Sequence, residues 1–436
     1  MKVIRLKDNT LTSKTVLDEI PNLTERVANK TLDQLEQEGI FVFPEIVSES
    51  KDITEEQMIL QKVNNSFRTE NVMGYLGYGN ERMIIESRFC KQNEDYFFRY
   101  LLEKVLDFPN IIDLKSDTDQ DNRLLNYLLF LFPYYLRTAM RKGLYKQYSC
   151  HRYNDGNVKG TVDIARHIRK NTPFIGNIAY SQRELSYDND LIELVRHTIE
   201  FIKGKSYGRQ LLSRVKDEVR IVNEATKDYN FFDRQRIIDT NTNNKIRHAY
   251  YREYSALQRL CLLILQHRKH QIGAGSWQIY GILFDGAWLW EEYMASVIGK
   301  RFYHPQNKAK KDGQLLFKGC GKIYPDFISR DSKDRVVADA KYKPIGNIGN
   351  DDYLQVLAYM FRFNAKTGFC LYPDSENTGD KRLWLNSGTT FEANVTKRDD
   401  FCLIKRGLRI PVNAESYDEF AAMMQDNEIE FRRRFG

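Results

Sequence analysis

The sequence predicts a multidomain protein of mixed α+β and α/β class. Three observations support this prediction: a β-rich N-terminal region, a middle region with apolar residues at helical spacing, and a C-terminal region in which helices and strands alternate. The chain has 436 residues, more than one hydrophobic core usually contains, so we expect at least two packed units. A hydrophobic fraction of 42% supplies enough apolar side chains to fill them.

The N-terminal region contains a predicted pair of strands. In VMGYLGYGNERMIIESRF, which starts at Val72, apolar runs flank a Gly79-Asn80 dipeptide that tolerates positive φ. The first 70 residues show only weak periodicity. We therefore predict a β-rich N-terminal arm or domain over residues 1–90.

The middle region, residues 91–275, is predicted to be mainly helical because its apolar residues recur at helical spacing. Its most apolar stretch, LLFLFPYYL (128–136), has two interpretations, a membrane segment or a buried helix. The stretch is too short to span a bilayer and contains Pro133, which favours a core helix. The Gly-Ala-Gly-Ser run at 273–276 then predicts a domain boundary.

The order of elements after this boundary is typical of an α/β unit, which we place at residues 276–390. The predicted elements are, in order, a helix (AWLWEEYMASVIGK), two strands (KIYPDFISR and RVVADAKYK), a helix (DDYLQVLAYMFRF) and a strand (GFCLYP). Residues 391–436 are predicted to form a C-terminal cap of one strand and one helix.

Composition limits the classes of function. A net charge of +7 suits a polyanionic partner without requiring one. The six cysteines form no CxxC pair, which argues against a zinc ribbon or an iron–sulfur site. We find no long apolar signal segment and no run of about 20 apolar residues, so we expect a cytoplasmic protein that is not in the membrane.

The strongest candidate for chemistry is an acidic residue two positions before a lysine. This tripeptide is weak evidence alone, since an ordinary solvated ion pair looks the same, and it also occurs at 49–51, 113–115 and 331–333. Asp331 and Lys333 lie in a polar run that is typical of a loop. Asp339 and Lys341 instead continue the buried strand Val-Val-Ala, and a two-residue period places them on one face.

A second carboxylate precedes this pair. Asp326 lies in IYPDFI, on the preceding predicted strand, and a hairpin of the two strands would bring Asp326, Asp339 and Lys341 together. Such a set is typical of the PD-(D/E)xK nucleases, in which carboxylates hold Mg²⁺, a hard ion that prefers oxygen ligands. Mn²⁺ is an alternative ion. Lys343 could replace Lys341 if the register were shifted, although the spacing favours Lys341.

Flanking residues add to the pattern. Glu291, in LWEEYM, is a candidate third metal ligand, although the adjacent Glu292 leaves open a surface helix that carries both. Gln355 and Tyr359 lie four residues apart on one face of the following helix, and a similar pair accompanies the catalytic strands of RecB-like nucleases. Among several basic clusters, we favour one for DNA contact: Lys308, Lys310 and Lys311.

The chain resembles the McrC family, the nuclease component of McrBC-type modification-dependent restriction systems. The likeness covers roughly residues 70–370 and rests on RKGLYKQYSCHRYNDGNVKGTVDIARHIRKN, on RELSYDNDLIELVRHTIEFI, on FDGAWLWEEY and on the catalytic strands. The resemblance implies that Asp326 and Asp339 are metal ligands, that Lys341 is the catalytic lysine, and that Glu291 matches the family's helix glutamate.

The resemblance also implies partners. We expect double-stranded DNA as substrate and, as partner, an AAA+ GTPase of the McrB type that reads the modified base and activates the nuclease. The ring of this GTPase is expected to receive the N-terminal region of the McrC-like chain, which stimulates GTP hydrolysis. The alternatives are a catalytically silent DNA-binding or regulatory protein on a nuclease fold, and a stand-alone DNA repair nuclease. The sequence does not indicate which DNA modification is recognised.

Overall fold

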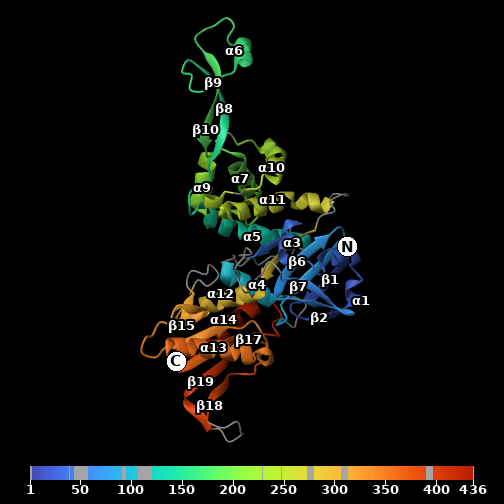
Figure 1. Ribbon diagram of the computed structural model, residues 1–436. Helices are drawn as coiled ribbons and strands as arrows, with labels where there is room; N and C mark the ends of the chain where they lie inside the picture. The colour runs from blue at the N-terminus through green and yellow to red at the C-terminus, as the bar shows by residue number, and fades with distance from the viewer. Residues whose placement is uncertain are drawn as a thin grey trace. The chain divides into compact units, whose positions relative to one another are not determined.

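The computed structural model shows a protein of mixed α and β structure with several sheets, as predicted (Figure 1). It describes residues 2–38, 40–43, 57–90, 95–106, 120–227, 229–246, 248–272, 279–305, 313–388 and 396–435. The chain forms two compact units: Met1–Asn110 joins Gly275–Gly436 in the first, and Ile111–Ala274 forms the second. The finer predicted division, with boundaries at residues 90, 275 and 390, stays a prediction.

The first unit contains a five-stranded sheet that combines distant segments of the chain. Its order is β1 (Lys2–Lys7), β7 (Glu81–Glu86), β6 (Val72–Tyr78), β11 (Tyr280–Asp285) and β3 (Ile40–Phe43). The predicted hairpin is confirmed, because β6 and β7 pair antiparallel and Gly79 has a φ of +52°. The strand β11 follows the predicted boundary near residue 275 and pairs with both β6 and β3.

The N-terminal residues add a small subdomain beside this sheet. It comprises a three-stranded sheet, β2 (Leu11–Ser13), β5 (Ser66–Thr69) and β4 (Leu60–Val63), and the short helices α1 (Lys14–Leu17), α2 (Pro21–Val27) and α3 (Leu32–Gln37). One buried apolar cluster joins both sheets, with Leu23 from α2, Leu76 from β6 and Leu283 from β11 among its members.

The six-stranded sheet of the first unit carries the predicted site. Its order is β12 (Phe302–Tyr303), β15 (Phe327–Ser329), β16 (Val336–Ala340), β17 (Thr367–Asp374), β19 (Thr396–Arg409) and β18 (Lys381–Ser387). The strands β16, β17 and β19 are parallel, and α13 (Asn350–Phe363) connects the first two. The sheet therefore includes β19 from the predicted C-terminal cap.

Helices cover this sheet. The unit contains α12 (Gly286–Ile298), α4 (Tyr96–Leu106) and α14 (Tyr417–Arg433), and a two-stranded hairpin, β13 (Gln314–Phe317) with β14 (Cys320–Ile323). Close packing of α13 on β17 depends on Gly368, because a Cβ there would lie 2.6 Å from Val356 and 2.7 Å from Met360. The close contact with β17 thus fixes the position of α13, the helix that carries Gln355.

One predicted strand was wrong. KIYPDFISR was expected to be continuous, but β14 ends at Ile323 and β15 begins at Phe327. Pro325 lies between them, and proline has no N–H for a ladder hydrogen bond. Asp326 therefore precedes β15 instead of lying inside a strand.

The second unit is built around helices. They are α5 (Gln120–Met140), α7 (Asp190–Lys203), α8 (Gly208–Ser213), α9 (Lys216–Ala225), α10 (Arg234–Asn243) and α11 (Glu253–Ile272). The interpretation of residues 128–136 as a core helix is confirmed, since Leu129, Leu131 and Phe132 on α5 are fully buried. Within the described ranges, no helix combines the length and the apolar character that a membrane span needs.

A hairpin projects from these helices, as Figure 1 shows. The strands β8 (Gln147–Asp155) and β10 (Ile178–Ser186) form its stalk, with β9 (Thr161–Val162) and α6 (Ile164–Lys170) near the tip. The prediction of a mainly helical region missed this sheet. Because much of the projection is solvated on both faces, its sequence lacks the alternating apolar pattern that predicts a half-buried strand.

Candidate active site

Asp339 and Lys341 meet at the end of β16. Asp339 is 2% exposed, and its Oδ2 lies 2.5 Å from the Lys341 Nζ. The Lys341 N–H donates to the Leu371 carbonyl at 2.7 Å, so Lys341 continues the parallel ladder one residue past the strand. The Trp290 indole N–H donates to the same carbonyl at 3.0 Å, which ties α12 to this position.

Asp326 lies beside this pair. The β15–β16 pairing is antiparallel, as predicted, and the Ala340 N–H donates to Asp326 Oδ2 at 2.8 Å. Burial raises the pKa of Asp326 well above its usual value, and the charges of Asp339 and Glu291 raise it further. The Ala340 hydrogen bond and the Lys341 charge oppose this rise without cancelling it. The carboxylates therefore repel one another in a poorly solvated place.

Glu291 projects from α12 toward the same carboxylates. It is 9% exposed, so the alternative of a surface helix that exposes both glutamates does not hold for Glu291. The charge of Glu291 raises the pKa of Asp326, which places the two groups within electrostatic reach.

Sequence reasoning missed His304, which links these elements. Its Nδ1 lies 2.8 Å from the Asp326 carbonyl oxygen and so donates there, and its ring stacks on Phe327. Its Nε2 lies 3.8 Å from Glu291 and 3.6 Å from Glu292. Burial lowers the pKa of His304, but the nearby Glu292 carboxylate, the hydrogen bond to the Asp326 carbonyl and the charge of Glu291 raise it more, so the pKa is raised overall. No motif around His304 could have identified it.

Gln355 and Tyr359 hold Lys341 from α13. The Lys341 Nζ donates to Gln355 Oε1 at 2.7 Å, and Gln355 Nε2 lies 2.6 Å from the Tyr359 hydroxyl. That hydroxyl donates to the Tyr324 carbonyl at 3.1 Å. The structure thus connects the two helix residues to the lysine, at the spacing that the sequence indicated.

Asp352, which the sequence analysis did not identify, is a second acidic neighbour of Lys341. Its Oδ1 lies 3.3 Å from the Lys341 Nζ and 2.9 Å from the Lys343 Nζ. Lys341 contacts Asp339 as well, whereas the described contacts of the Lys343 ammonium are with Asp352. Burial lowers the pKa of Lys341, but the surrounding carboxylates raise it more, so Lys341 is held as an ammonium. The geometry favours Lys341 over Lys343 as the lysine of the site.

The donor set suits a hard divalent cation, because carboxylate oxygens are the ligands that Mg²⁺ prefers. Burial is the main cause of the raised pKa of Asp326, and the charges of Asp339 and Glu291 add a repulsion that such a cation would relieve. Within the described part of the chain, however, no three His, Cys, Asp or Glu side chains are grouped closely enough to hold a metal ion. The oxygen ligands of Asp326 and Asp339 suit Mg²⁺ by their chemistry. In the structure, the positive charge beside Asp339 is the Lys341 ammonium.

The basic cluster predicted for DNA contact, Lys308, Lys310 and Lys311, lies outside the described residues. Another basic surface lies at the far end of the β15–β16 hairpin. Arg330, Arg335 and Arg362 line a hollow of about 670 Å³, and no carboxylate is among its lining residues. A hollow lined by one sign of charge attracts the opposite sign, so this surface suits phosphates.

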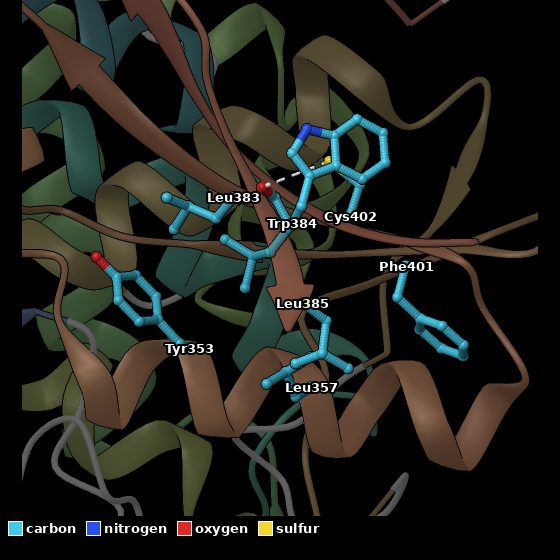
Figure 2. Close-up of a pocket in the computed structure, with 8 residues that line it drawn as sticks. Tyr353, Leu357, Leu383, Trp384, Leu385, Phe401 and Cys402 are labelled. Carbon is cyan, nitrogen blue, oxygen red and sulfur yellow. Dashed lines mark hydrogen bonds between the residues drawn. The ribbon is translucent and has the colours of Figure 1, made fainter. Parts of the chain in front are cut away.

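A second cavity is apolar and separate from the carboxylates. Figure 2 shows it between α13 and the strands β18 and β19, where it encloses about 160 Å³. Tyr353 and Leu357 line it from the helix, and Leu383 and Phe401 from the strands. None of the predicted site residues lines it.

Comparisons with known proteins give a family. A family model described as "McrBC 5-methylcytosine restriction system component" matches residues 67–373, and no curated protein matches the chain. Two similar solved structures come from Thermococcus gammatolerans. A refined half-complex from a tetradecameric assembly of McrB AAA+ hexamers with bound McrC has 15% identity and a TM-score of 0.49, and covers 98% of this chain and 100% of that one.

The second structure, the McrBC complex of the same organism, has 16% identity and a TM-score of 0.33, and covers 69% of this chain and 88% of that one. At these scores the two structures carry no argument of their own. The family model spans the β6–β7 hairpin, the second unit and the β15–β16 pair with the adjoining Asp326 and Lys341. The chain belongs to the family of McrBC 5-methylcytosine restriction system components.

Proposed function

We propose that the chain is an McrC-like endonuclease subunit of a modification-dependent restriction system. It hydrolyses phosphodiester bonds of double-stranded DNA with Mg²⁺, or with Mn²⁺ in its place, and works with an McrB-like AAA+ GTPase. The observation that carries this proposal is the convergence of the partly buried Asp326 and the buried Asp339 with Lys341 at one end of the β15–β16 pair. A cytoplasmic location belongs to the same proposal, because the substrate is DNA.

The fold around these residues supports a PD-(D/E)xK core. Asp326 precedes the first strand of an antiparallel pair, and Asp339 and Lys341 end the second. A helix then returns the chain to a parallel neighbour strand. Asp326 and Asp339 would hold the Mg²⁺ as a pair, and Glu291 is a further carboxylate near Asp326.

The chain's own residues supply the rest of the chemistry. When bound, Mg²⁺ supplies charge that stabilises the phosphorane-like transition state. Lys341 keeps its proton because Asp339 and Asp352 surround it, so it offers a fixed positive charge to the attacked phosphate and to the water. Gln355 and Tyr359 hold the ammonium in that position.

The arginine-lined hollow extends the site for a long substrate. Cleavage of a duplex requires contacts to phosphates away from the scissile bond. Ser329 ends β15 and Arg335 directly precedes β16, so both lie at the end of the hairpin opposite to Asp326 and Asp339. We assign DNA contact to Arg330, Arg335 and Arg362, alongside the predicted Lys308 cluster.

The projecting hairpin is a candidate for contact with the GTPase. Several of its large apolar side chains are exposed to solvent: Tyr148, Val162, Ile164, Ile168, Phe174, Ile175 and Leu185. Exposed apolar side chains gathered on one projection mark an interaction surface. The earlier expectation that residues 1–90 bind the partner stays a prediction, since these residues fill buried strands as well as surface.

The test is a cleavage assay on plasmid DNA with and without 5-methylcytosine, in the presence of Mg²⁺. The chain is assayed alone and with the McrB-type GTPase of the same genome plus GTP. We expect cleavage of methylated DNA only when GTPase and GTP are present. Asp339→Asn should abolish it, and Asp331→Asn, in the exposed loop tripeptide, should not.

The two alternatives predict other results. A stand-alone repair nuclease would cut without the GTPase, and a catalytically silent protein would not cut under any condition although it binds DNA. Cleavage by Asp339→Asn at the wild-type rate would refute the site itself.

A further inference from the structure

The residue after the candidate catalytic lysine is held from all sides. Lys343 N–H donates to the Lys341 carbonyl at 2.8 Å, so the chain makes a tight turn centred on Tyr342. Tyr342 is 3% exposed, and its hydroxyl lies 2.8 Å from the Ser87 hydroxyl. The same hydroxyl donates to the Met73 sulfur at 3.5 Å. The N-terminal strands β6 and β7 thus reach the turn that ends the catalytic strand.

Arg88 also contacts Tyr342. Its guanidinium carbon lies 4.7 Å from the centre of the Tyr342 ring, and one of its terminal nitrogens donates to the Tyr342 carbonyl. The other terminal nitrogen donates to Asn71 Oδ1 at 3.0 Å and lies 3.6 Å from Asp8 Oδ2. Both side chains of the Arg88–Asp8 pair are buried. A planar guanidinium can bridge two such acceptors, which a single ammonium cannot do in this geometry.

The same cluster holds the start of α12. The Gly286 N–H donates to the Asn71 carbonyl at 2.9 Å, while the Asn71 side chain accepts from Arg88. A Cβ on Gly286 would lie 2.8 Å from the Tyr342 ring, so the first turn of α12 packs directly on Tyr342. Glu291 lies on this helix, five residues further on.

We propose that Arg88 and Tyr342 are positioning residues that fix Lys341 relative to the carboxylates of the candidate active site. The cluster joins the end of β16, which carries Lys341, to the start of α12, which carries Glu291. We call the contact of Arg88 with Tyr342 the clamp. A misplacement of about 1 Å at a reacting group can lower the rate roughly 100-fold, so a clamp that fixes the position of Lys341 should have a large effect on the rate of cleavage. The inference rests on the proposed nuclease function, and Arg88 acts through Tyr342 without touching the reacting atoms.

The experiment measures amide exchange and cleavage on the full chain. The variants are Arg88→Met, which removes the clamp, and Tyr342→Phe, which removes only the hydroxyl contacts. Arg26→Met is the matched control, because Arg26 also stacks on a tyrosine, Tyr78, at 4.4 Å, but away from the catalytic strand. Hydrogen–deuterium exchange of a peptide covering residues 340–344 is followed for each protein, since this readout requires no nuclease activity.

We expect exchange in this peptide to rise about tenfold in Arg88→Met and less in Tyr342→Phe, with no change in Arg26→Met. In the cleavage assay with the GTPase, kcat should fall about 10- to 100-fold in Arg88→Met, while KM for DNA stays within about twofold. A purely structural role would instead lower kcat only in proportion to the folded fraction. That proportional loss overturns the proposal.

Unchanged exchange in both clamp variants also overturns it. If Arg88→Met does not fold, Tyr342→Phe decides by the same criteria, because it keeps the packed ring. If the wild-type chain never cleaves DNA, the proposed function fails, and the exchange measurement alone decides whether the clamp holds Lys341 in place.

Discussion

Replacing Lys341 by methionine should destabilise the first unit strongly, because it strips the cation from a buried carboxylate. The Lys341 side chain is 11% exposed and the Asp339 side chain 3% exposed, with 2.5 Å between Nζ and Oδ2. Removing one partner of a buried ion pair costs about 3–5 kcal/mol, since the other charge stays buried and unpaired. We expect a loss of this size at about pH 7.5 without added metal.

The companion variant, Asp339→Asn, should cost less. Lys341 keeps Asp352 at 3.3 Å and Gln355 at 2.7 Å, so its ammonium stays neutralised and hydrogen-bonded. The repulsion between Asp339 and Asp326 is also removed. The double variant should therefore lose less stability than the sum of the single variants, with a coupling free energy of at least about 2 kcal/mol.

Urea unfolding, followed by tryptophan fluorescence, measures the free energy of unfolding of the first unit, which contains Lys341 and Asp339. The tryptophans among the described residues, Trp288, Trp290 and Trp384, belong to the first unit. Lys343→Met is the matched control: the Lys343 side chain is 42% exposed and its ammonium pairs with Asp352, so we expect a loss below about 1 kcal/mol. A coupling below about 0.5 kcal/mol would refute the reasoning, because Lys341 would then not neutralise Asp339.

Three further predictions concern acid stability, DNA binding and metal binding. His197 is buried in the second unit, and burial, aided by the charge of Arg234, lowers its pKa to about 4. The stabilising contribution of the neutral His197 ring is complete above about pH 6.5 and is lost as the pH falls toward 4. Calorimetry should therefore show that the free energy of unfolding of His197→Gln lies below that of the wild type by about 2 kcal/mol less at about pH 5 than at about pH 7.5. A difference that does not change with pH would contradict the buried neutral ring. The double variant Arg335→Gln with Arg362→Gln should weaken DNA binding about 10-fold or more and flatten its salt dependence in a filter or anisotropy assay, and an unchanged salt slope would exclude this hollow as a phosphate contact. Millimolar Mg²⁺ should raise the melting temperature of the wild type but not of Asp326→Asn, whereas equal shifts in both would place any bound ion elsewhere.

The sequence by itself predicted the local elements of the site. The alternation in Val336–Ala340 places Asp339 and the following Lys341 on one face, because the side-chain period of a strand is two. The four-residue spacing of Gln355 and Tyr359 places both on one face of α13, because the helical period is 3.6. The hairpin of β6 and β7 followed from the same local signals.

Only the tertiary structure brought distant residues to these elements. His304 and Asp352 reach the site although neither stands in a motif that indicates a role. The contact of Arg88 with Tyr342 joins residues 254 positions apart, and the pairing of β11 with β6 also joins distant segments, as in Tyr280 with Gly77.

Periodicity determines which face a residue occupies, but not which distant segment covers that face. The contact of Met73, Ser87 and Arg88 with Tyr342, in the turn after β16, could therefore not be predicted from periodicity. Burial of the Tyr342 ring against Phe89 and Arg88, with the Arg88 guanidinium beside Asp8, stabilises that contact.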